Sequence, residues 1–250
     1  MSELPRNSRN LLKGFFRLFR VVNLPTVPGD VLAGAAVYLY FSDAMLDVPQ
    51  IAMACLASVL IYMFGLSDND ITGAQMGDSN RPIPDGQISL EMARFARFFT
   101  ITLAMLVAKA AKMHLVWWLT AFFLSIAIVL YNRSKNSFLM GLCRTLNVIL
   151  GGCVVGGAAL FSASAQLAEL ALVVVALLVG VYITAITYYS KGEESDPHKK
   201  HIVGYLVGAI VYLQLVVLLI FPSKPLLIGG AVMLVLLRVL KRILPEVEPS

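Results

Sequence analysis

Residues 170–189 read LALVVVALLVGVYITAITYY and contain no charged side chain in twenty positions. An α-helix needs about 20 mostly apolar residues to cross the hydrocarbon core of a bilayer, so this stretch predicts a membrane-spanning helix. Its apolar residues are continuous and do not alternate with polar ones, which favours a helix over a strand of a membrane barrel. The stretch therefore indicates an integral membrane protein.

The rest of the chain has the same character. Of 250 residues, 58% are hydrophobic and 14% are charged, whereas an average soluble domain has roughly 25% charged residues. We expect spans near residues 21–42, 49–66, 93–111, 113–131, 139–162, 168–189, 202–221 and 225–244. The prediction is an all-α, polytopic transmembrane helical bundle of about eight spans, forming a single domain over residues 21–244.

The basic residues set the expected orientation. If all eight segments cross, 17 of the 20 Lys and Arg residues lie on one side, with Lys109, Lys112 and Lys224 opposite. If the third segment does not cross, the division becomes 11 to 9. Cytoplasmic loops carry the excess of basic residues, so the first division is favoured. We expect a protein of the cell inner membrane, or an equivalent membrane, with both termini cytoplasmic. The net charge of +5 then reflects orientation, and nucleic acid is not an expected partner.

The two ends of the chain are expected to be cytoplasmic segments. In residues 1–20, basic residues recur at helical spacing opposite Phe15, Phe16 and Phe19. This pattern predicts a basic amphipathic helix lying on the lipid surface. A frayed tail is the alternative. Residues 245–250 form the expected C-terminal tail.

Two loops, residues 67–87 and 190–201, are rich in carboxylates and share the cytoplasmic face because each follows an even-numbered span. Two facing groups of carboxylate oxygens suit Mg²⁺, which binds through a few carboxylates, water and substrate phosphates. The candidate metal ligands are Asp68, Asp70, Asp78, Glu193, Glu194 and Asp196. Ordinary solvated loops are the alternative interpretation.

Basic side chains on this face are suited to phosphate oxygens, with which they form strong hydrogen bonds. The candidates are Arg81, Lys135, Arg144 and Lys191. A diphosphate with a lipid tail fits such a site, with its head at the metal and its tail between helices. Asp30 lies inside the first apolar run, where a carboxylate is a functional candidate by default. Asn23 precedes it and is either a substrate ligand or a helix cap.

The pair Asn69-Asp70, followed by Arg81-Pro82-Ile83-Pro84-Asp85-Gly86, resembles the motifs of the UbiA superfamily of intramembrane prenyltransferases. Weaker similarities are Asn23-Leu24 followed by Ala33-Gly34, then Tyr131 with Lys135, and then Gly141, Arg144 and Asn147. The first acidic motif departs from the family pattern, because Gly73 and Gly77 stand where the family has further acids. The second keeps its carboxylates out of register. In these departures the chain resembles a divergent branch, such as the UbiA-like members encoded in ebo-type clusters.

The resemblance implies transfer of an isoprenyl group from an isoprenyl diphosphate to a small or lipid acceptor, with Mg²⁺ assisting departure of the diphosphate. It implies catalytic roles for Asn69, Asp70, Tyr131 and Tyr188, the tyrosine faces stabilising an allylic cation. Interfacial anchoring is the alternative role for the tyrosines. The implied substrate ligands are Asn23, Asp30, Arg81, Lys135, Arg144, Asn147 and Lys191.

Two other functions are compatible with the sequence. The two glycines in the acidic motif favour a non-catalytic relative that binds or presents a lipid-linked precursor. A small-solute transporter is the third hypothesis, although charges inside the spans are few and no inverted repeat is visible. For an enzyme, the acceptor is left open between an aromatic ring, a glyceryl lipid and a cyclitol-like molecule.

Overall fold

Eight long helices occupy the positions of the eight predicted spans. The structure is a computed structural model that describes residues 6–79, 81–157, 165–191 and 197–244. Its elements are α1 (Arg6–Leu18), the short 3-10 helix η1 (Val21–Asn23), α2 (Thr26–Tyr40), α3 (Val48–Met76), α4 (Leu90–Ala110), α5 (Leu115–Ser134), α6 (Ser137–Gly156), α7 (Gln166–Ser190), α8 (Pro197–Ile220) and α9 (Lys224–Ile243). The described part of the chain contains no strand, which confirms the all-α prediction.

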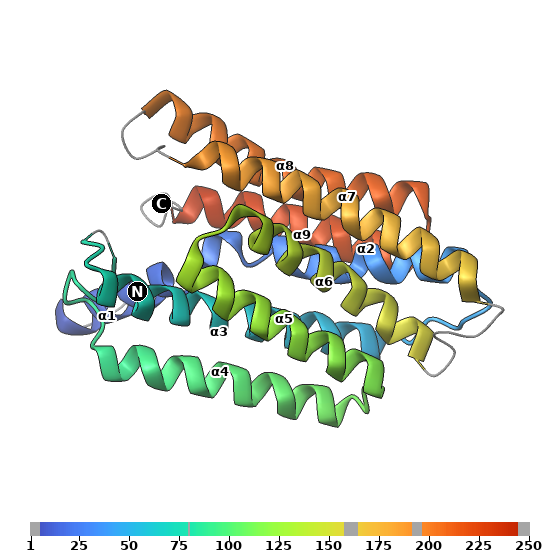
Figure 1. The fold of residues 1–250 in the computed structure, drawn as a ribbon, viewed down its shortest axis with the longest axis horizontal. Helices are drawn as coiled ribbons and strands as arrows, with labels where there is room; N and C mark the ends of the chain where they lie inside the picture. Colours follow the sequence, from blue (N-terminus) through green and yellow to red (C-terminus); the bar gives the residue numbers. More distant parts are fainter. Residues whose placement is uncertain (1–5, 80, 158–164, 192–196, 245–250) are drawn as a thin grey trace.

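The bundle has the composition of a membrane domain. Five segments of the described residues are long and apolar enough to cross a bilayer: α3, α5, α6, α7 and His201–Ile220 of α8. The other three predicted spans, α2, α4 and α9, lie alongside them (Figure 1). Large apolar side chains are exposed on the outer helices, such as Phe95 on α4, Phe122 on α5 and Leu178 on α7. Such surfaces are stable against lipid, not water.

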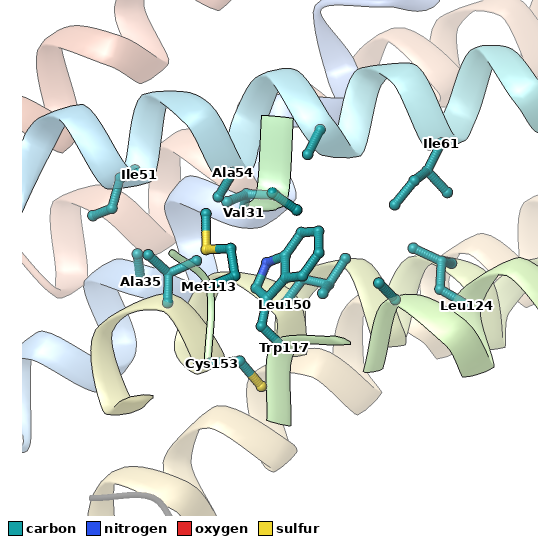
Figure 2. Packing of buried hydrophobic residues seen from close by; sticks show 14 of the residues in the cluster. Val31, Ala35, Ile51, Ala54, Ile61, Met113, Trp117, Leu124, Leu150 and Cys153 are labelled. Carbon is teal, nitrogen blue, oxygen red and sulfur yellow. The ribbon is translucent and has the colours of Figure 1, made fainter. Parts of the chain in front are cut away.

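The centre of the bundle is built on a close contact between α2 and α6. An added Cβ would lie 1.9 Å from the Val148 carbonyl oxygen at Gly34, and 2.0 Å from the Val31 carbonyl oxygen at Gly151. The two backbones therefore touch, as is typical where small residues face each other between membrane helices. Beside this contact, Trp117 of α5 is fully buried among apolar side chains from α2, α3 and α6 (Figure 2).

The segments that carry the predicted motifs gather at one end of the bundle. Helix α1, the connection between α3 and α4, the turn between α5 and α6, and the end of α9 all lie at the left of Figure 1. The end of α7 and the start of α8 lie there too. This placement brings segment 67–87 and the helix ends on either side of residues 192–196 to the same end of the bundle, as the count of spans predicts.

The acidic segment 67–87 is not wholly a loop. Helix α3 continues ten residues past the predicted end of its span and stops at Met76, where Gly77 takes a left-handed conformation with φ 88°. Its polar residues do not end the helix because they have partners there. For example, the Ser67 hydroxyl donates to the Met63 carbonyl at 3.0 Å. The loop therefore begins at Gly77, and the predicted loop boundary was wrong.

One face of helix α1 packs on protein, and its predicted position on the lipid surface stays a prediction. Leu18 is fully buried in a cluster with Ile71 and Ile88. Arg17 forms a 2.5 Å ion pair with Asp85, in the connection between α3 and α4. The N-terminal helix thus holds the connection that carries the Arg-Pro motif, and its frayed-tail alternative is wrong. The predicted tail, residues 245–250, lies outside the described residues.

Candidate functional site

A cavity of about 360 Å³ opens among six helices and extends into the bundle. Its polar lining includes Arg20, Asn23, Thr26, Ser58, Tyr62, Asn69, Arg81, Tyr131, Asn132, Lys135, Arg144 and Asn147. Its apolar lining includes Ile61, Leu66, Leu124, Ile128, Ile183, Ile186, Val203, Val207 and Ile210. One space therefore offers cationic groups at the end of the bundle and a hydrocarbon wall between the helices.

Arg81 is held between two carboxylates. Its Nη1 donates to Asp70 Oδ1 at 2.6 Å and to the Asn69 carbonyl at 3.4 Å. Its Nε donates to Asp78 Oδ2 at 2.9 Å. Asp70 is buried in the last turns of α3, whereas Asp78 is exposed in the connection that follows. The guanidinium is thereby fixed beside the cavity, which it lines.

Lys135 approaches the same point from the turn between α5 and α6. Its backbone is left-handed, with φ 52°, which is uncommon for a residue with a side chain. The ammonium donates to the Asn69 side chain and lies 5.7 Å from the centre of the Tyr131 ring. Burial lowers the pKa of Lys135 from its usual value, and the nearby positive charges of Arg81 and Arg20 lower it further. Cations are thus crowded at this end of the cavity.

Arg20 is a lining residue that the sequence reasoning missed. It links α1 to η1 in a left-handed conformation, φ 41° and ψ 52°. Strained backbone of this kind gathers at functional sites because the surrounding structure must hold it. The sequence reasoning used Arg20 as part of a basic helical face and as an orientation signal. Its distinguishing feature is the change of backbone direction, which helical spacing does not reveal.

Asp68 belongs to a separate contact. It accepts from Arg97 Nη1 at 3.0 Å and from Asn132 Nδ2 at 2.9 Å. Asn132 also donates to the Gly65 carbonyl at 2.9 Å, and so joins α5 to α3. Asp68 therefore does not share a cation with Asp70. Arg97 and Asn132 were also missed, because their roles depend on how α4 and α5 pack against α3.

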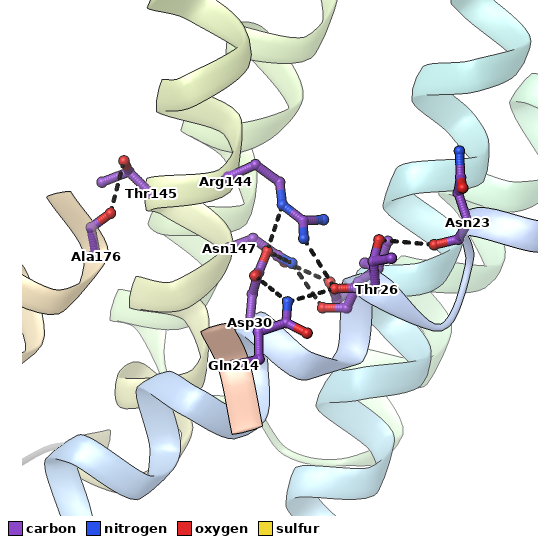
Figure 3. Close-up of polar contacts among 10 residues, drawn as sticks. Asn23, Thr26, Asp30, Arg144, Thr145, Asn147, Ala176 and Gln214 are labelled. Atoms are coloured by element: carbon purple, nitrogen blue, oxygen red, sulfur yellow. Dashed lines mark hydrogen bonds and ion pairs between the residues drawn. The ribbon is translucent and has the colours of Figure 1, made fainter. Parts of the chain in front are cut away.

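Members of a buried polar network around Asp30 form the deeper wall of the cavity (Figure 3). Asp30 is inaccessible to solvent and pairs with Arg144 Nε at 2.9 Å. Asn147 Nδ2 donates to it at 3.1 Å, and Gln214 Nε2 donates at 2.7 Å. Gln214, on α8, was not predicted. Asp30 is therefore occupied by three side chains from α6 and α8, and its direct contacts are with them.

Two members of this network also line the cavity. Arg144 Nη2 donates to the Thr26 carbonyl at 3.0 Å, and Asn147 accepts from the Ser58 hydroxyl at 2.5 Å. Asp30 is thus placed to orient Arg144 and Asn147 towards a ligand without contacting it. Asn23 lines the cavity as well, and the structure assigns no capping hydrogen bond to its side chain among the described residues.

Two predicted site residues lie elsewhere. Ile186 and Ser190 of α7 line the cavity, and Tyr188 lies roughly 200° around the helix from Ile186. Tyr188 is 72% exposed, with the Lys191 ammonium 5.8 Å from its ring centre. Tyr188 and Lys191 therefore do not line the cavity in this arrangement, and their roles at the reacting group and at phosphate stay predictions. Tyr62 of α3 supplies the second aromatic ring of the lining instead.

The described carboxylates do not by themselves fit a Mg²⁺ site. Within residues 6–79, 81–157, 165–191 and 197–244, no group of three or more His, Cys, Asp or Glu side chains is placed to hold a metal ion. Asp70 and Asp78 face one guanidinium, while Asp68 faces Arg97 and Asn132. The other predicted ligands, Glu193, Glu194 and Asp196, lie outside the described residues.

The chain is similar to known proteins of the kind that its motifs predict. No protein-family model matches the chain. A curated relative, digeranylgeranylglyceryl phosphate synthase of Methanococcus maripaludis, is 25% identical over 154 residues. The match covers 58% of this chain and 54% of the relative, so the chain spans about half the length of the curated relative that it matches.

Solved structures extend the likeness to nearly the whole chain. A UbiA homologue from Aeropyrum pernix K1 has a TM-score of 0.54 at 13% identity, with 98% of this chain and 92% of that chain covered. A UbiA homologue from Archaeoglobus fulgidus, bound to DMAPP and Mg²⁺, has a TM-score of 0.53 at 14% identity, with coverages of 93% and 87%. At such identities the likeness is one of fold. The chain has the fold of the UbiA homologues, as its motifs predict.

Proposed function

We propose that this protein is an integral-membrane prenyltransferase that moves an isoprenyl group from an isoprenyl diphosphate to an acceptor. The observation that carries the proposal is the shape and chemistry of the cavity. Arg20, Arg81 and Lys135 line one part, and the side chains of α7 and α8 supply an apolar wall. A prenyl diphosphate has the same division between a polyanionic head and a hydrocarbon tail.

The relatives support this proposal. The curated relative is named as a synthase of digeranylgeranylglyceryl phosphate, and the Archaeoglobus fulgidus homologue is described with DMAPP and Mg²⁺. Both descriptions involve a prenyl group. No comparable observation favours the transporter hypothesis.

In the proposed reaction, the carbon–oxygen bond of the prenyl diphosphate breaks and the diphosphate leaves with the electron pair. Arg81 and Lys135 stabilise the developing negative charge, because preorganised donors act strongly in a site shielded from water. Asp70 holds Arg81, and Asn69 holds Lys135. These contacts keep both cations in place before the substrate binds.

The remaining allylic cation lies beside aromatic rings and hydrocarbon. Tyr131 and Tyr62 line the cavity, and the faces of aromatic rings attract a cation. Apolar side chains exclude water, which would otherwise capture the cation. A nucleophilic atom of the acceptor then bonds to the prenyl carbon, and its proton passes to the departed diphosphate. Asn23, Arg144 and Asn147 are the proposed ligands of acceptor or phosphate oxygens.

Mg²⁺ stays a prediction that rests on the family resemblance and on the Archaeoglobus fulgidus homologue. The orientation is also a proposal: the end of the bundle that holds α1 and the cavity's cationic groups faces the cytoplasm. The excess of basic residues at that end supports this orientation, because cytoplasmic loops carry such an excess. Labelling of single cysteines placed at Asp43 and at Arg133, in sealed inverted vesicles, tests the orientation.

The proposed activity is tested with purified protein in lipid nanodiscs, geranyl diphosphate, and an extract of membrane lipids and quinone precursors as acceptors. Mass spectrometry should detect a prenylated product and release of pyrophosphate. Asp70→Ala should abolish transfer, while Asp43→Ala, at the exposed opposite end, should leave it unchanged. Full activity of Asp70→Ala would overturn the role of Asp70. A protein that copurifies with a polyprenyl lipid but never consumes the diphosphate would favour the non-catalytic alternative.

A further inference from the structure

Gly73 provides the space in which the Arg81 guanidinium lies. A Cβ added at Gly73 would be 2.5 Å from Arg81 Nε, 2.7 Å from its Cζ and 2.8 Å from Asp78 Oδ2. Real Cβ atoms do not approach neighbours so closely, so any other residue at this position would push the guanidinium away. The flat cation is seated on the backbone of α3 because this residue has no side chain.

Position 73 is also one of the two where the acidic motif lacks an expected carboxylate. The result is a different charge balance at this end of the cavity. Among the described residues around Arg81, Arg20, Arg81 and Lys135 contribute three positive charges, while Asp70 and Asp78 contribute two negative charges. An additional carboxylate at position 73 would remove this excess and displace Arg81. The glycine therefore changes both the charge and the geometry of the site.

From the cradle and this charge balance we propose that the Arg81 guanidinium is the resident cation of this acidic site, and that it allows the protein to bind the diphosphate head without a divalent metal ion. This inference rests on the proposed function, because it concerns the head group of the same substrate. Asp70, Asp78 and the Asn69 carbonyl hold Nε and Nη1. Among the described residues, no partner is assigned to Nη2, which leaves this donor for a phosphate oxygen.

The arrangement has the properties of a preformed anion site. The Nη2 group of Arg81 has two N–H donors for phosphate oxygens, and a guanidinium that is already fixed loses little further freedom when it binds them. Lys135 and Arg20 supply further positive charge from two other segments of the chain. All three cations lie on the cavity that would hold the prenyl tail, so head and tail are recognised in one space.

The test measures binding of inorganic pyrophosphate to the purified protein in nanodiscs by isothermal titration calorimetry, in EDTA and in Mg²⁺. We expect binding in EDTA, with an affinity within about threefold of that in Mg²⁺. Gly73→Ala should weaken binding in EDTA by about tenfold or more, since displaced charge-assisted hydrogen bonds are strong. The displaced group is the end of a flexible side chain, so the fold should survive.

Gly208→Ala is the matched control, because it is also a helical glycine and its added Cβ would meet only the flexible Lys241 ammonium, at 3.2 Å, among the described residues. It should bind pyrophosphate as the parent protein does. Arg81→Lys is a second variant that keeps the charge but removes the planar donor, and it should also bind at least about tenfold more weakly in EDTA. Thermal unfolding of each variant shows whether it is folded.

Binding of pyrophosphate that needs Mg²⁺ in the parent protein would overturn the inference. Unchanged binding in both folded variants would also overturn it. Either result leaves prenyl transfer to be judged from the product assay. If pyrophosphate binds without a metal ion but no prenyl group is transferred, the inference on the site is supported and the proposed activity is contradicted.

Discussion

The Nε of Arg144 lies 2.9 Å from a carboxylate oxygen of Asp30, and the Asp30 side chain is fully enclosed by protein. The pair joins α2 to α6 inside the bundle. Asn147 and Gln214 satisfy further lone pairs of the same carboxylate. The charges are thus neutralised and hydrogen-bonded within the span, the condition under which a buried ion pair is tolerated.

Removing one partner of this pair should be costly. Asp30→Ala leaves the Arg144 charge unpaired and should lower the free energy of unfolding by about 3–5 kcal/mol. The double variant Asp30→Leu with Arg144→Met should recover much of that loss, because no buried charge is left alone. Unfolding in mixed detergent micelles, followed by circular dichroism, measures both. Equal losses in the single and double variants would show that the charge is not the cause.

Arg20 is expected to contribute to binding of the diphosphate. Arg20→Ala should raise KM for the prenyl diphosphate by about 10- to 100-fold, since hydrogen bonds to charged groups contribute about 1.5–3 kcal/mol. Alanine keeps the same left-handed backbone requirement, so the change tests the side chain. Lys109→Ala, in the last turn of α4, is the control for the loss of one positive charge away from the cavity. A steady-state KM equal to the parent value would remove Arg20 from the site.

The apolar wall should set the length of the prenyl chain. Val207 and Ile183 lie on α8 and α7 and line the cavity. Val207→Trp places a larger side chain in that space, so turnover of dimethylallyl diphosphate should persist while turnover of geranylgeranyl diphosphate falls. Product formation across a series of chain lengths is the measurement. Val216→Trp, on the exposed surface of α8, should leave the preference unchanged, and an equal loss at every length would contradict the assignment.

The contact between α2 and α6 gives a prediction on stability alone. Gly34→Ala places a methyl group 1.9 Å from the Val148 carbonyl oxygen, and overpacking of this kind costs about 1–3 kcal/mol. Gly204→Ala meets nothing within 4 Å and should raise stability by about 0.4–1 kcal/mol. Thermal unfolding of the two variants should therefore shift in opposite directions. A neutral Gly34→Ala would show that the helices can separate.

Sequence reasoning predicted the helices well because long apolar runs need no knowledge of their neighbours. The eight helices and the clustering of loops at one end follow from local patterns. Asn69, Arg81, Lys135, Arg144 and Asn147, which line the cavity, were predicted partly from the charge of one face and partly from the family resemblance. Resemblance supplied the functional meaning of those residues. The same reasoning did not predict which face of a helix packs inward. Tyr188 is exposed because it lies on the outer face of α7.

It also failed where two distant segments define one contact. Asp68 and Asp70 are two residues apart, and their carboxylates point to different arginines on different segments. Arg20 enters the cavity because α1 packs on Ile88 and turns the chain at its end. The packing between helices determines the partners of these side chains, and the spacing of residues in the sequence does not encode that packing.

The buried network has a consequence for how the protein is made. Asp30 belongs to the first span, but its partners follow 117 residues later at Asn147 and 184 residues later at Gln214. During synthesis on the ribosome, the first span therefore leaves the exit tunnel with a carboxylate that nothing yet neutralises. A charge at the centre of a span costs about 2.5–3.5 kcal/mol on insertion. We therefore expect the first span to stay beside the translocon, or beside a membrane insertase, until α6 is made and Arg144 completes the ion pair.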